Sequence, residues 1–477
     1  MSDFPTQLLI NGQWLDGSGA KPLAIVNPAT EETFAEVCSA TADEIGQAAE
    51  AGQAAFESGW RDMPPGERTR LLRNLAKRIH ENVETLAQLE TRNVGKPIGD
   101  ARWEADAGAK VFDYYAGAIG HLCGQTIPVA RGGFDFTLRQ PMGVIAAITP
   151  WNFPFLIACW KVAPALAAGN SVVLKPASLT PLTALMLGQL AQEAGLPDGV
   201  LQVVPGSGSE AGNALATHPL VRKIGFTGST EVGATIMKLA ADDIKRVSLE
   251  LGGKSPNIVF ADADWQRAAA ESPMSVFANT GQDCCARSRM FIEQSVFDGF
   301  VDQFVAATES LKIGDPMDEA TQVGPMVSAA QRELSESHIA GARDAGREIR
   351  TGGDRPNGGG FYLNPAVVTG VETEDRAWRE EIFGPVVCLR PFTDETEMLR
   401  EVNDTNFGLS GSVWSNDLSR ALRVARQVES GVISINSHSS VHTEAPFGGF
   451  KRSGLGRDLG MSAMEACTEV KNIYVGE

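Results

Sequence analysis

Between residues 144 and 251 the sequence alternates short apolar runs with segments of helical character, and this alternation restricts the fold more than any other feature. The apolar runs, predicted as strands, are 144–148, 171–174, 201–204, 221–226 and 246–251. Helices are predicted between them at 160–168, 181–194, 209–217 and 230–240. Strands joined by crossovers of this length form a parallel, doubly wound sheet. Such sheets bind ligands at the carboxyl ends of their strands.

A second alternating series follows, and the ends of the chain add shorter elements. The strands predicted in this series are 257–260, 290–293, 366–368, 386–389, 412–414 and 433–436. Residues 42–118 have apolar side chains at helical spacing, whereas 8–10, 24–26 and 470–475 are predicted as short strands. The segment 123–139 lacks the helical period and is expected to be an extended excursion. The whole pattern predicts an α/β protein.

Chain length and net charge narrow the classes of function. At 477 residues the chain exceeds what one hydrophobic core usually fills, so two or three domains are expected. The formal net charge of −18 disfavours nucleic acid and anionic membranes as partners. The chain contains no run of about 18 apolar residues, as a membrane span would need. No secretory signal is visible at the start, so the expected location is the cytoplasm.

Cysteine and histidine spacing gives no sign of a metal site. The seven cysteines are odd in number and contain no CxxC pair, which disfavours a disulfide framework and a tetrathiolate zinc site. His438 and His442 stand four residues apart, but no third ligand accompanies them. We therefore expect no bound metal.

The segment 281–285, Gly-Gln-Asp-Cys-Cys, offers a nucleophile. A cysteine thiolate is strongly nucleophilic near neutral pH, although a cysteine pair in an apolar stretch is more commonly buried packing. Glu250 ends a predicted buried strand and precedes Gly252 and Gly253. Its carboxylate is either solvated at the strand end or a general base with a raised pKa. The two glycines allow the backbone to turn sharply after it.

Polar groups also follow neighbouring predicted strands. Asn152 comes after the strand 144–148, and its amide either donates to a developing oxyanion or satisfies the turn. Gly228 and Ser229 precede a predicted helix whose free amides would suit a pyrophosphate. The motif is not GxGxxG, so by itself it is weak evidence for a dinucleotide. Lys175 ends the strand 171–174 and is expected at the same edge of the sheet.

Together these motifs resemble the aldehyde dehydrogenase superfamily. The matching segments are 149–154, 160–161, 175–176, 226–233, 250–254, 281–284, 380–385 and 446–451. Their order and spacing match as well, including the 34 residues from Glu250 to Cys284. The resemblance covers almost the whole chain. It implies an NAD(P)+-dependent enzyme that oxidises an aldehyde to a carboxylic acid.

The resemblance implies a role for each matched residue. Cys284 is similar to the nucleophile, Glu250 to the base that activates the deacylating water, and Asn152, with the backbone N–H of Cys284, to the oxyanion hole. The thiolate would form a thiohemiacetal and, after hydride transfer to the nicotinamide, a thioester. Residues that match the family's cofactor and active-site contacts are Lys175, Trp151, Gly228, Ser229, Glu381, Phe383 and Lys161.

The choice of cofactor is left open by Ser178. Many NAD-preferring members carry a glutamate at this position, which would repel a 2′-phosphate. Serine removes that repulsion and leaves Lys175 nearby, so the implied cofactor is NAD or NADP.

The resemblance also suggests a substrate tunnel. Its expected lining residues are Phe153, Ile157, Trp160, Asp283, Cys285, Val441 and Phe447. Glu104 lies where aminoaldehyde-oxidising relatives place an acid. An anionic mouth formed by Glu104 and Asp283 would favour an aminoaldehyde or betaine aldehyde. The alternatives are that Glu104 is a solvated helix residue and that the enzyme is a broad-specificity or semialdehyde dehydrogenase.

Three further functions compete with this interpretation. Acylating members that transfer the acyl group to coenzyme A typically lack the glutamate at the Glu250 position. A non-catalytic structural or binding descendant would be expected to have lost Cys284, Glu250 or Asn152, and all three are present. A cysteine hydrolase would need a histidine partner for the cysteine, and the sequence nominates none.

The resemblance implies a three-part organisation. A Rossmann-type cofactor domain is expected over 1–121 and 141–252, and an α/β catalytic domain over 253–455. The segments 122–140 and 456–477 would form an oligomerisation element with an exposed sheet edge. A homodimer or homotetramer is therefore expected.

Overall fold

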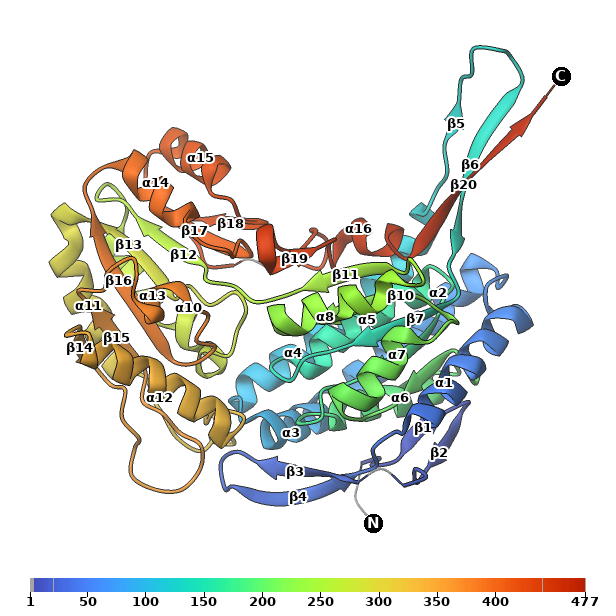
Figure 1. Ribbon diagram of the computed structural model, residues 1–477, viewed down its shortest axis with the longest axis horizontal. Coiled ribbons are helices and arrows are strands. Elements are labelled where there is room, and N and C mark those ends of the chain that lie inside the picture. Colours follow the sequence, from blue (N-terminus) through green and yellow to red (C-terminus); the bar gives the residue numbers. More distant parts are fainter. Residues whose placement is uncertain (1–3, 20, 440, 477) are drawn as a thin grey trace.

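Two large sheets flanked by helices form the body of the molecule, and a narrow arm projects from one side (Figure 1). The computed structural model describes residues 4–19, 21–439 and 441–476. Within these residues the strands form sheets of eight, seven, three and two strands. No helix in the described part of the chain combines the length and the apolar character needed to cross a bilayer.

The eight-stranded sheet contains the parallel core that the sequence predicts. Its five central strands are all parallel: β11 (Arg246–Glu250), β10 (Val221–Thr227), β7 (Val144–Ile148), β8 (Ser171–Lys175) and β9 (Leu201–Val203). The chain runs from β7 outward to β9, then returns to the other side of β7 to form β10 and β11. This reversal places a crevice at the carboxyl ends of β7 and β10, where open α/β sheets bind ligands. The prediction of a doubly wound α/β fold is confirmed.

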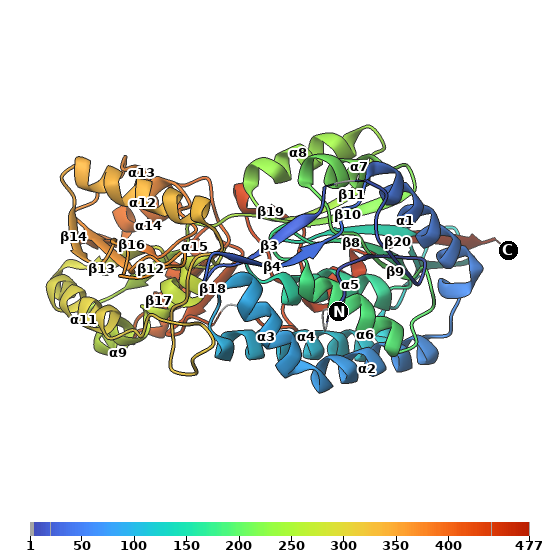
Figure 2. The same ribbon diagram turned by 90° about the horizontal axis from the view of Figure 1, so that it is seen from below.

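Short antiparallel strands complete this sheet, and helices cover both faces (Figure 2). The edge strands are β1 (Leu8–Ile10), β2 (Gln13–Leu15) and β19 (Gly454–Leu455). One face carries α1 (Ala42–Ala55), α7 (Asn213–Thr217) and α8 (Thr230–Ala241). The other carries α2 (Pro65–Glu81), α3 (Val83–Val94), α4 (Ile98–Ala118), α5 (Pro154–Ala167) and α6 (Leu182–Glu193).

Helix α5 begins at Pro154, six residues before the predicted start at 160. Every residue from Pro154 to Ala167 is buried, so the helix has no polar face and its sequence shows no amphipathic period. Proline is well suited to the first helical position because its missing N–H has no intrahelical partner there. The early start brings the amino end of α5 close to the loop that follows β7.

The seven-stranded sheet contains the second predicted series. Its parallel strands are β12 (Pro256–Val259), β13 (Arg289–Glu293), β15 (Ala366–Thr369), β16 (Val386–Phe392), β17 (Ser410–Trp414) and β18 (Val432–Ile435). An antiparallel edge strand, β14 (Glu348–Thr351), was not predicted. The helices of this part are α9 (Trp265–Glu271), α10 (Met274–Phe277), α11 (Phe297–Glu309), α12 (Ala329–Asp344), α13 (Arg376–Arg379), α14 (Glu395–Asn403) and α15 (Leu418–Gln427).

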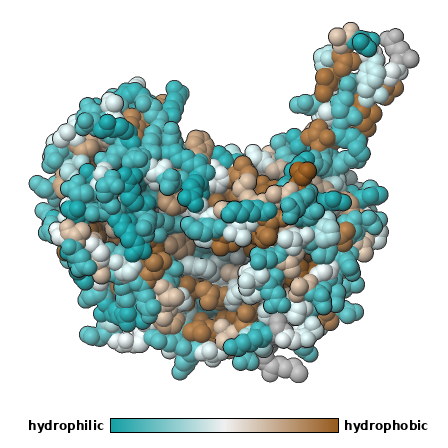
Figure 3. Space-filling model, in the orientation of Figure 1, coloured by the Kyte–Doolittle hydropathy of each residue, from teal (hydrophilic) through white to brown (hydrophobic). Residues whose placement is uncertain are grey.

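The arm is a three-stranded sheet built from segments far apart in the sequence. It consists of β5 (Thr126–Ile127), β6 (Phe134–Pro141) and β20 (Thr468–Val475), and β6 and β20 pair antiparallel along their whole length. The remaining elements are β3 (Leu23–Asn27), β4 (Glu32–Val37) and α16 (Gly460–Glu465). Figure 3 shows apolar surface along the arm. Its exposed apolar side chains include Phe134, Leu138, Val470, Tyr474 and Val475.

Candidate active site

Two cavities meet between the two large sheets. The larger, of about 740 Å³, lies at the carboxyl ends of β7, β8 and β10 and is closed on the far side by residues 381–383. The smaller, of about 230 Å³, has mostly apolar walls and is called the apolar cavity here. Ile157, Thr227, Leu251 and Cys284 line both. Cys284 is the residue among these four that has a nucleophilic side chain.

A strained loop presents Cys284 to the two cavities. Asn279, Thr280 and Gly281 have φ angles of 48°, 59° and 72°, a left-handed conformation that is costly for the first two. The side-chain amide of Asn279 donates to the backbone carbonyl of Asn152 at 2.9 Å. A Cβ atom on Gly281 would lie 2.2 Å from the carbonyl oxygen of Gly384, so only glycine fits. These contacts hold the backbone of the loop in one conformation.

The surroundings of Cys284 favour the protonated form of its thiol. Its pKa is raised well above the ordinary value by a hydrogen bond with Cys285, by burial and by the nearby carboxyl of Asp283. Burial also raises the pKa of Asp283, although this carboxyl accepts a hydrogen bond of 2.8 Å from the backbone N–H of Cys285. Attack by Cys284 therefore requires removal of a proton or a change in the charges around it.

Glu250 lies at the carboxyl end of β11 and lines the apolar cavity together with Cys284. It is 3% exposed, and neither carboxylate oxygen has a hydrogen-bond partner within the described residues. Its pKa is raised well above the ordinary value, first by burial and then by the charge of Asp458. A carboxyl with a raised pKa beside a cavity is suited to proton transfer.

Lys161 does not lie on the wall of either cavity. Its ammonium forms a buried ion pair of 2.8 Å with Asp458, and both residues line a small void of about 20 Å³ near Glu250. The expectation of Lys161 on the active-site wall is therefore corrected, because the helix α5 turns this side chain toward Asp458. The charge of Lys161 lowers the pKa of Glu250 and opposes the effect of Asp458.

Gly252 and Gly253 allow neighbouring atoms to pack closely against the backbone and do not form a left-handed turn. Neither glycine has a positive φ. A Cβ atom on Gly252 would lie 2.0 Å from a carboxylate oxygen of Glu381, and one on Gly253 would lie 2.2 Å from the carbonyl oxygen of Cys284. The strand end after Glu250 therefore packs directly against two predicted site residues, which any larger side chain would prevent.

The predicted cofactor residues gather in the larger cavity. These lining residues are Trp151, Lys175, Ser178, Gly228, Ser229, Glu381 and Phe383, and Asn152 lines it as well. The rings of Trp151 and Phe383 meet edge to face with centroids 5.2 Å apart. Ser229 is the N-cap of α8, so this helix directs its N-terminal amides toward the cavity.

Lys175 and Ser178 occupy the end of the larger cavity near Gly206. The Lys175 ammonium donates to the carbonyls of Pro176 and Gly206, and the Ser178 hydroxyl donates to the same Gly206 carbonyl at 3.0 Å. Burial lowers the pKa of Lys175 to about 8. Both side chains are thus prearranged on one backbone segment.

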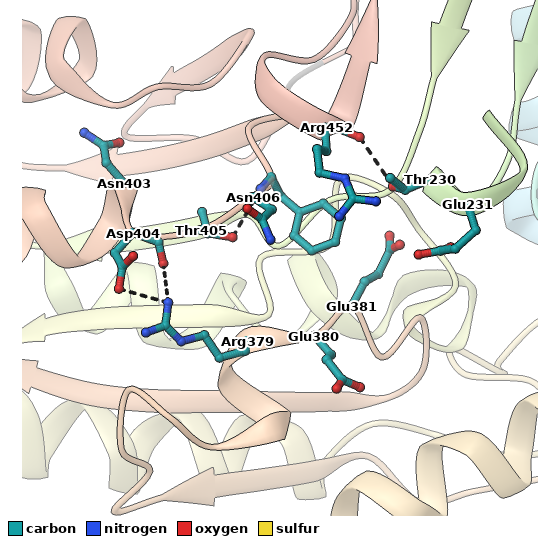
Figure 4. Close-up of a pocket in the computed structure, with 11 residues that line it drawn as sticks. Thr230, Glu231, Arg379, Glu380, Glu381, Asn403, Asp404, Thr405, Asn406 and Arg452 are labelled. Atoms are coloured by element: carbon teal, nitrogen blue, oxygen red, sulfur yellow. Dashed lines mark hydrogen bonds and ion pairs between the residues drawn. The ribbon is translucent and has the colours of Figure 1, made fainter. Parts of the chain in front are cut away.

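Glu381 stands between the larger cavity and a third, polar cavity of about 510 Å³. Figure 4 shows the carboxylates of Glu231 and Glu381 directed into the same space of this polar cavity. One carboxylate oxygen of Glu381 accepts a hydrogen bond of 2.9 Å from the backbone N–H of Gly253. Burial nevertheless raises the pKa of Glu381 to about 7, and the charge of Glu231 adds to the rise.

The apolar cavity brings together nearly all of the predicted substrate residues. Those on its wall are Phe153, Ile157, Trp160, Asp283, Cys285, Val441 and Phe447. The rings of Trp160 and Phe447 lie 5.3 Å apart. The cavity therefore offers apolar and aromatic surface with few polar groups.

Glu104 does not reach this cavity, and the expectation of an anionic mouth that includes it is wrong. The side chain is fully buried between helices and forms an ion pair with Lys96. The alternative of a solvated helix residue is wrong as well. The helix period identifies the face of α4 on which Glu104 lies, but the sequence does not reveal that a lysine eight residues earlier neutralises it.

Sequence reasoning missed several residues that the structure brings to the site. Asp100 lines the apolar cavity, and Gln331 lines the larger one and donates to the carbonyl of Phe383 at 2.9 Å. Trp103 precedes Glu104 in the stretch that resembles aminoaldehyde-oxidising relatives, and Trp103, unlike Glu104, lines the apolar cavity. Asp458 follows a glycine-rich segment and gave no signal.

Three potential metal ligands, Asp283, Cys284 and Cys285, lie within 4.8 Å of one another among the described residues. They belong to the loop 279–285 that presents Cys284, which is called the nucleophile loop here. The two nitrogens of His438, considered above as a possible ligand, each lie 3.2 Å from a serine hydroxyl.

Comparison with known proteins agrees with this geometry. The model of the "Aldehyde dehydrogenase family" matches residues 14–473. The chain belongs to the aldehyde dehydrogenase family. Among curated members, a phenylacetaldehyde dehydrogenase of Pseudomonas fluorescens is 43% identical over 99% of this chain and 96% of its own. Betaine aldehyde dehydrogenase 1 of Oryza sativa subsp. japonica is also 43% identical, over 98% and 94%.

Solved structures of other family members have the same fold. The NAD+ complex of an aldehyde dehydrogenase from Bacillus cereus superposes with a TM-score of 0.97 at 40% identity, covering 99% of this chain and 96% of that chain. An NADP-dependent enzyme of E. coli superposes with a TM-score of 0.98 at 40% identity, covering 99% and 98%. This aldehyde dehydrogenase thus shares the architecture of its relatives from end to end.

Proposed function

We propose that this aldehyde dehydrogenase oxidises an aldehyde to a carboxylic acid with NAD or NADP through a thioester on Cys284. The observation that carries the proposal is that Cys284 lines both cavities, so a substrate and a cofactor can meet at its sulfur. The buried carboxyl of Glu250 lines the same apolar cavity. An acid retained at this position favours release by hydrolysis over transfer to coenzyme A.

In the proposed reaction, the Cys284 thiol gives up its proton to solvent, and the resulting thiolate attacks the aldehyde carbon to form the oxyanion of a thiohemiacetal. The side-chain amide of Asn152 and the backbone N–H of Cys284 stabilise the oxyanion. A bound oxidised nicotinamide would supply the acceptor for the hydride that leaves this carbon. Glu250 then takes a proton from water, which attacks the thioester and releases the acid. The buried ion pair of Lys161 and Asp458 adjusts the charge around Glu250.

The larger cavity fits a dinucleotide in size and in donor arrangement. A volume of about 740 Å³ is within the usual range of cofactor sites. Ser229 and the N-terminus of α8 would hold the pyrophosphate, Lys175 and Ser178 one ribose, and Glu381 the other, with Trp151, Gly228 and Phe383 against the nicotinamide half. Because Ser178 carries no charge, a 2′-phosphate is accepted, as the name of the E. coli relative also suggests.

We propose an aldehyde with an apolar or aromatic body as the substrate, because apolar side chains, some of them aromatic, form most of the wall of the apolar cavity. The 43% identity to a phenylacetaldehyde dehydrogenase supports this class. An aminoaldehyde or betaine aldehyde is the second candidate. It is favoured by Asp100 and Asp283 on the same wall, since a quaternary ammonium binds well among aromatic rings and carboxylates. Burial raises the pKa of both acids, which weakens that attraction.

We further propose a homodimer or homotetramer and the domain division 1–121 with 141–252, 253–455, and 122–140 with 456–477. Exposed apolar side chains on the arm and the open edges of β5 and β20 support the assembly. The mass in solution, measured by light scattering, would be two or four times that of the chain.

A cytoplasmic location stays a prediction that fractionation of the source cells would test.

The reaction is tested by mixing the enzyme with aldehydes and either cofactor and following the absorbance of reduced nicotinamide. Cys284→Ala should abolish turnover. Cys285→Ala is the matched comparison at the neighbouring thiol, and it should keep most of the activity. If the second variant is the inactive one, the nucleophile is misassigned.

A further inference from the structure

A buried ion pair lies close to the first turn of α5. Lys96 is in the turn between α3 and α4, and Glu104 is on α4. Both are at most 1% exposed, and Glu90 of α3 lies 3.8 Å from the Lys96 ammonium. Burial and the charge of Glu104 raise the pKa of Glu90 well above its usual range, whereas the charge of Lys96 opposes the rise. Buried charges of this kind are costly unless each is fully paired and hydrogen-bonded.

The second oxygen of Glu104 binds the amino end of α5. It accepts a hydrogen bond of 3.0 Å from the backbone N–H of Leu156. Leu156 is the third residue of α5. The backbone N–H at this position has no partner within the helix and is usually capped by the side chain of the N-cap residue. The N-cap residue of α5, Phe153, makes no such hydrogen bond. A carboxylate from another helix therefore caps α5.

The geometry that allows this cap is set by close packing of α4 on α5. Gly108 lies one turn after Glu104 on the same face of α4. A Cβ atom on Gly108 would lie 2.6 Å from the ring of Phe155 and 3.0 Å from the sulfur of Cys159. The helices thus approach closely enough at Gly108 for the Glu104 side chain to reach the α5 backbone.

The residues next to the capped amide belong to the proposed catalytic site. The Lys96 ammonium lies 4.2 Å from the ring centroid of Phe153, which lines the apolar cavity. Asn152, the proposed oxyanion donor, immediately precedes Phe153. Movement of the first turn of α5 would therefore move both the cavity wall and the donor.

We propose that Glu104, anchored by Lys96, is a positioning residue that caps α5 and thereby fixes Asn152 and Phe153 at the reacting centre. The inference rests on the proposed function, because the position of Asn152 matters only if an oxyanion forms beside Cys284. In this role Glu104 sets the position of the groups that stabilise the transition state and does not bind a charged substrate.

Two conservative variants separate capping from charge pairing. Glu104→Gln keeps an oxygen acceptor at the same reach and removes the charge, whereas Glu104→Asp keeps the charge and shortens the reach. The readout is the rate constant for forming reduced cofactor in a single turnover with enzyme in excess, which does not depend on the fraction of misfolded chains. Asp113→Asn, at an exposed position of α4, is the control.

We expect Glu104→Asp to lower this rate constant about 10- to 100-fold, as a small misplacement of a catalytic group does. Glu104→Gln should stay within about threefold of the parent because its hydrogen bond to Leu156 remains. The KM for the cofactor should not change in either variant. If the rate constant of Glu104→Asp equals that of the parent and the rate constant of Glu104→Gln is lowered, the charge of Glu104 matters and its cap on α5 does not. That result would overturn the proposal. Unchanged rate constants with a lowered Tm would reduce Glu104 to a structural role.

These outcomes differ from a failure of the proposed function. If the parent enzyme reduces neither cofactor with any aldehyde, the reaction itself is refuted and the inference falls with it. If the parent reacts and both variants match it in rate and in Tm, the reaction stands and the positioning role alone is refuted.

Discussion

The side-chain amide of Asn152 donates a hydrogen bond of 2.9 Å to the backbone carbonyl of Gln282, two residues before Cys284. The backbone carbonyl of Asn152 in turn accepts from Asn279 of the same loop. The loop after β7 and the nucleophile loop are therefore fastened to each other in both directions. The proposed oxyanion site between them would therefore be preorganised before a substrate arrives.

Replacing the donor tests this arrangement. Asn152→Ala should lower kcat about 10²- to 10³-fold, because one oxyanion donor contributes roughly that much. The dissociation constant of the cofactor, measured by fluorescence titration, should remain within a few-fold of the parent value. An equal loss of cofactor binding would show that the variant disturbs the larger cavity and not the oxyanion alone.

Glu250 is expected to act after hydride transfer. Glu250→Gln should slow steady turnover about 10²- to 10⁴-fold, the range typical of general base catalysis. Rapid mixing should still show a burst of reduced cofactor close to one equivalent per chain. Loss of the burst would mean that Glu250 acts earlier, on the thiol of Cys284.

The buried carboxyl of Glu250 should also lower the stability of the folded protein. Its folded pKa is raised, whereas an unfolded glutamate titrates near pH 4.3. The unfolded chain therefore binds fewer protons above that pH, and stability contributed by this group is lost as pH rises toward the folded pKa.

Glu250→Gln should consequently raise Tm by an amount that is small near pH 4.3 and grows toward neutral pH. Calorimetry across this range would measure it. Glu36→Gln, at an exposed position of β4, is the comparison variant and should show no such trend. A difference in Tm that does not vary with pH would contradict the assignment of a raised pKa.

Cofactor preference should respond to Ser178. The parent enzyme is expected to turn over with NADP+, and Ser178→Glu should shift the ratio of kcat/KM values toward NAD+ by repelling a 2′-phosphate. One charge pair close to a protein surface is worth up to about 4 kcal/mol before solvation is subtracted, so a shift of at least tenfold is expected. A parent enzyme inert with NADP+ at millimolar concentration would defeat this idea.

The walls of the apolar cavity predict discrimination by substrate charge. Phenylacetaldehyde should exceed succinic semialdehyde in kcat/KM by about one to two orders of magnitude, because a carboxylate would lose its hydration there without a cationic partner. No lysine or arginine is among the described residues that line this cavity. Asp100→Asn should lower activity on betaine aldehyde and spare phenylacetaldehyde. Equal efficiency on all three aldehydes would indicate a broad-specificity enzyme.

The sequence predicted the parts of the fold that have regular hydrophobic periods. The central strands from β7 to β11 begin and end within one residue of their predicted limits. The start of α5 was missed because a helix buried on all sides has no amphipathic signal. The edge strand β14 was missed because its four residues alternate only weakly.

At the site, motif matching located residues and could not describe their surroundings. The structure places Cys284, Glu250 and Asn152 on the walls of the two adjoining cavities. The left-handed conformations of Asn279 and Thr280 follow from contacts with distant backbone, which the sequence does not show. Glu104 illustrates the same limit. Whether an acid on a helix attracts a ligand or caps a neighbouring helix depends on the element that packs against it.

The meeting of two cavities at Cys284 has a kinetic consequence. The residues that line the apolar cavity and those that line the larger cavity overlap only at their junction. In the proposed reaction, an aldehyde and a dinucleotide would therefore occupy separate cavities and meet only at Cys284. We expect no compulsory order of arrival, which initial-rate kinetics with both concentrations varied would test.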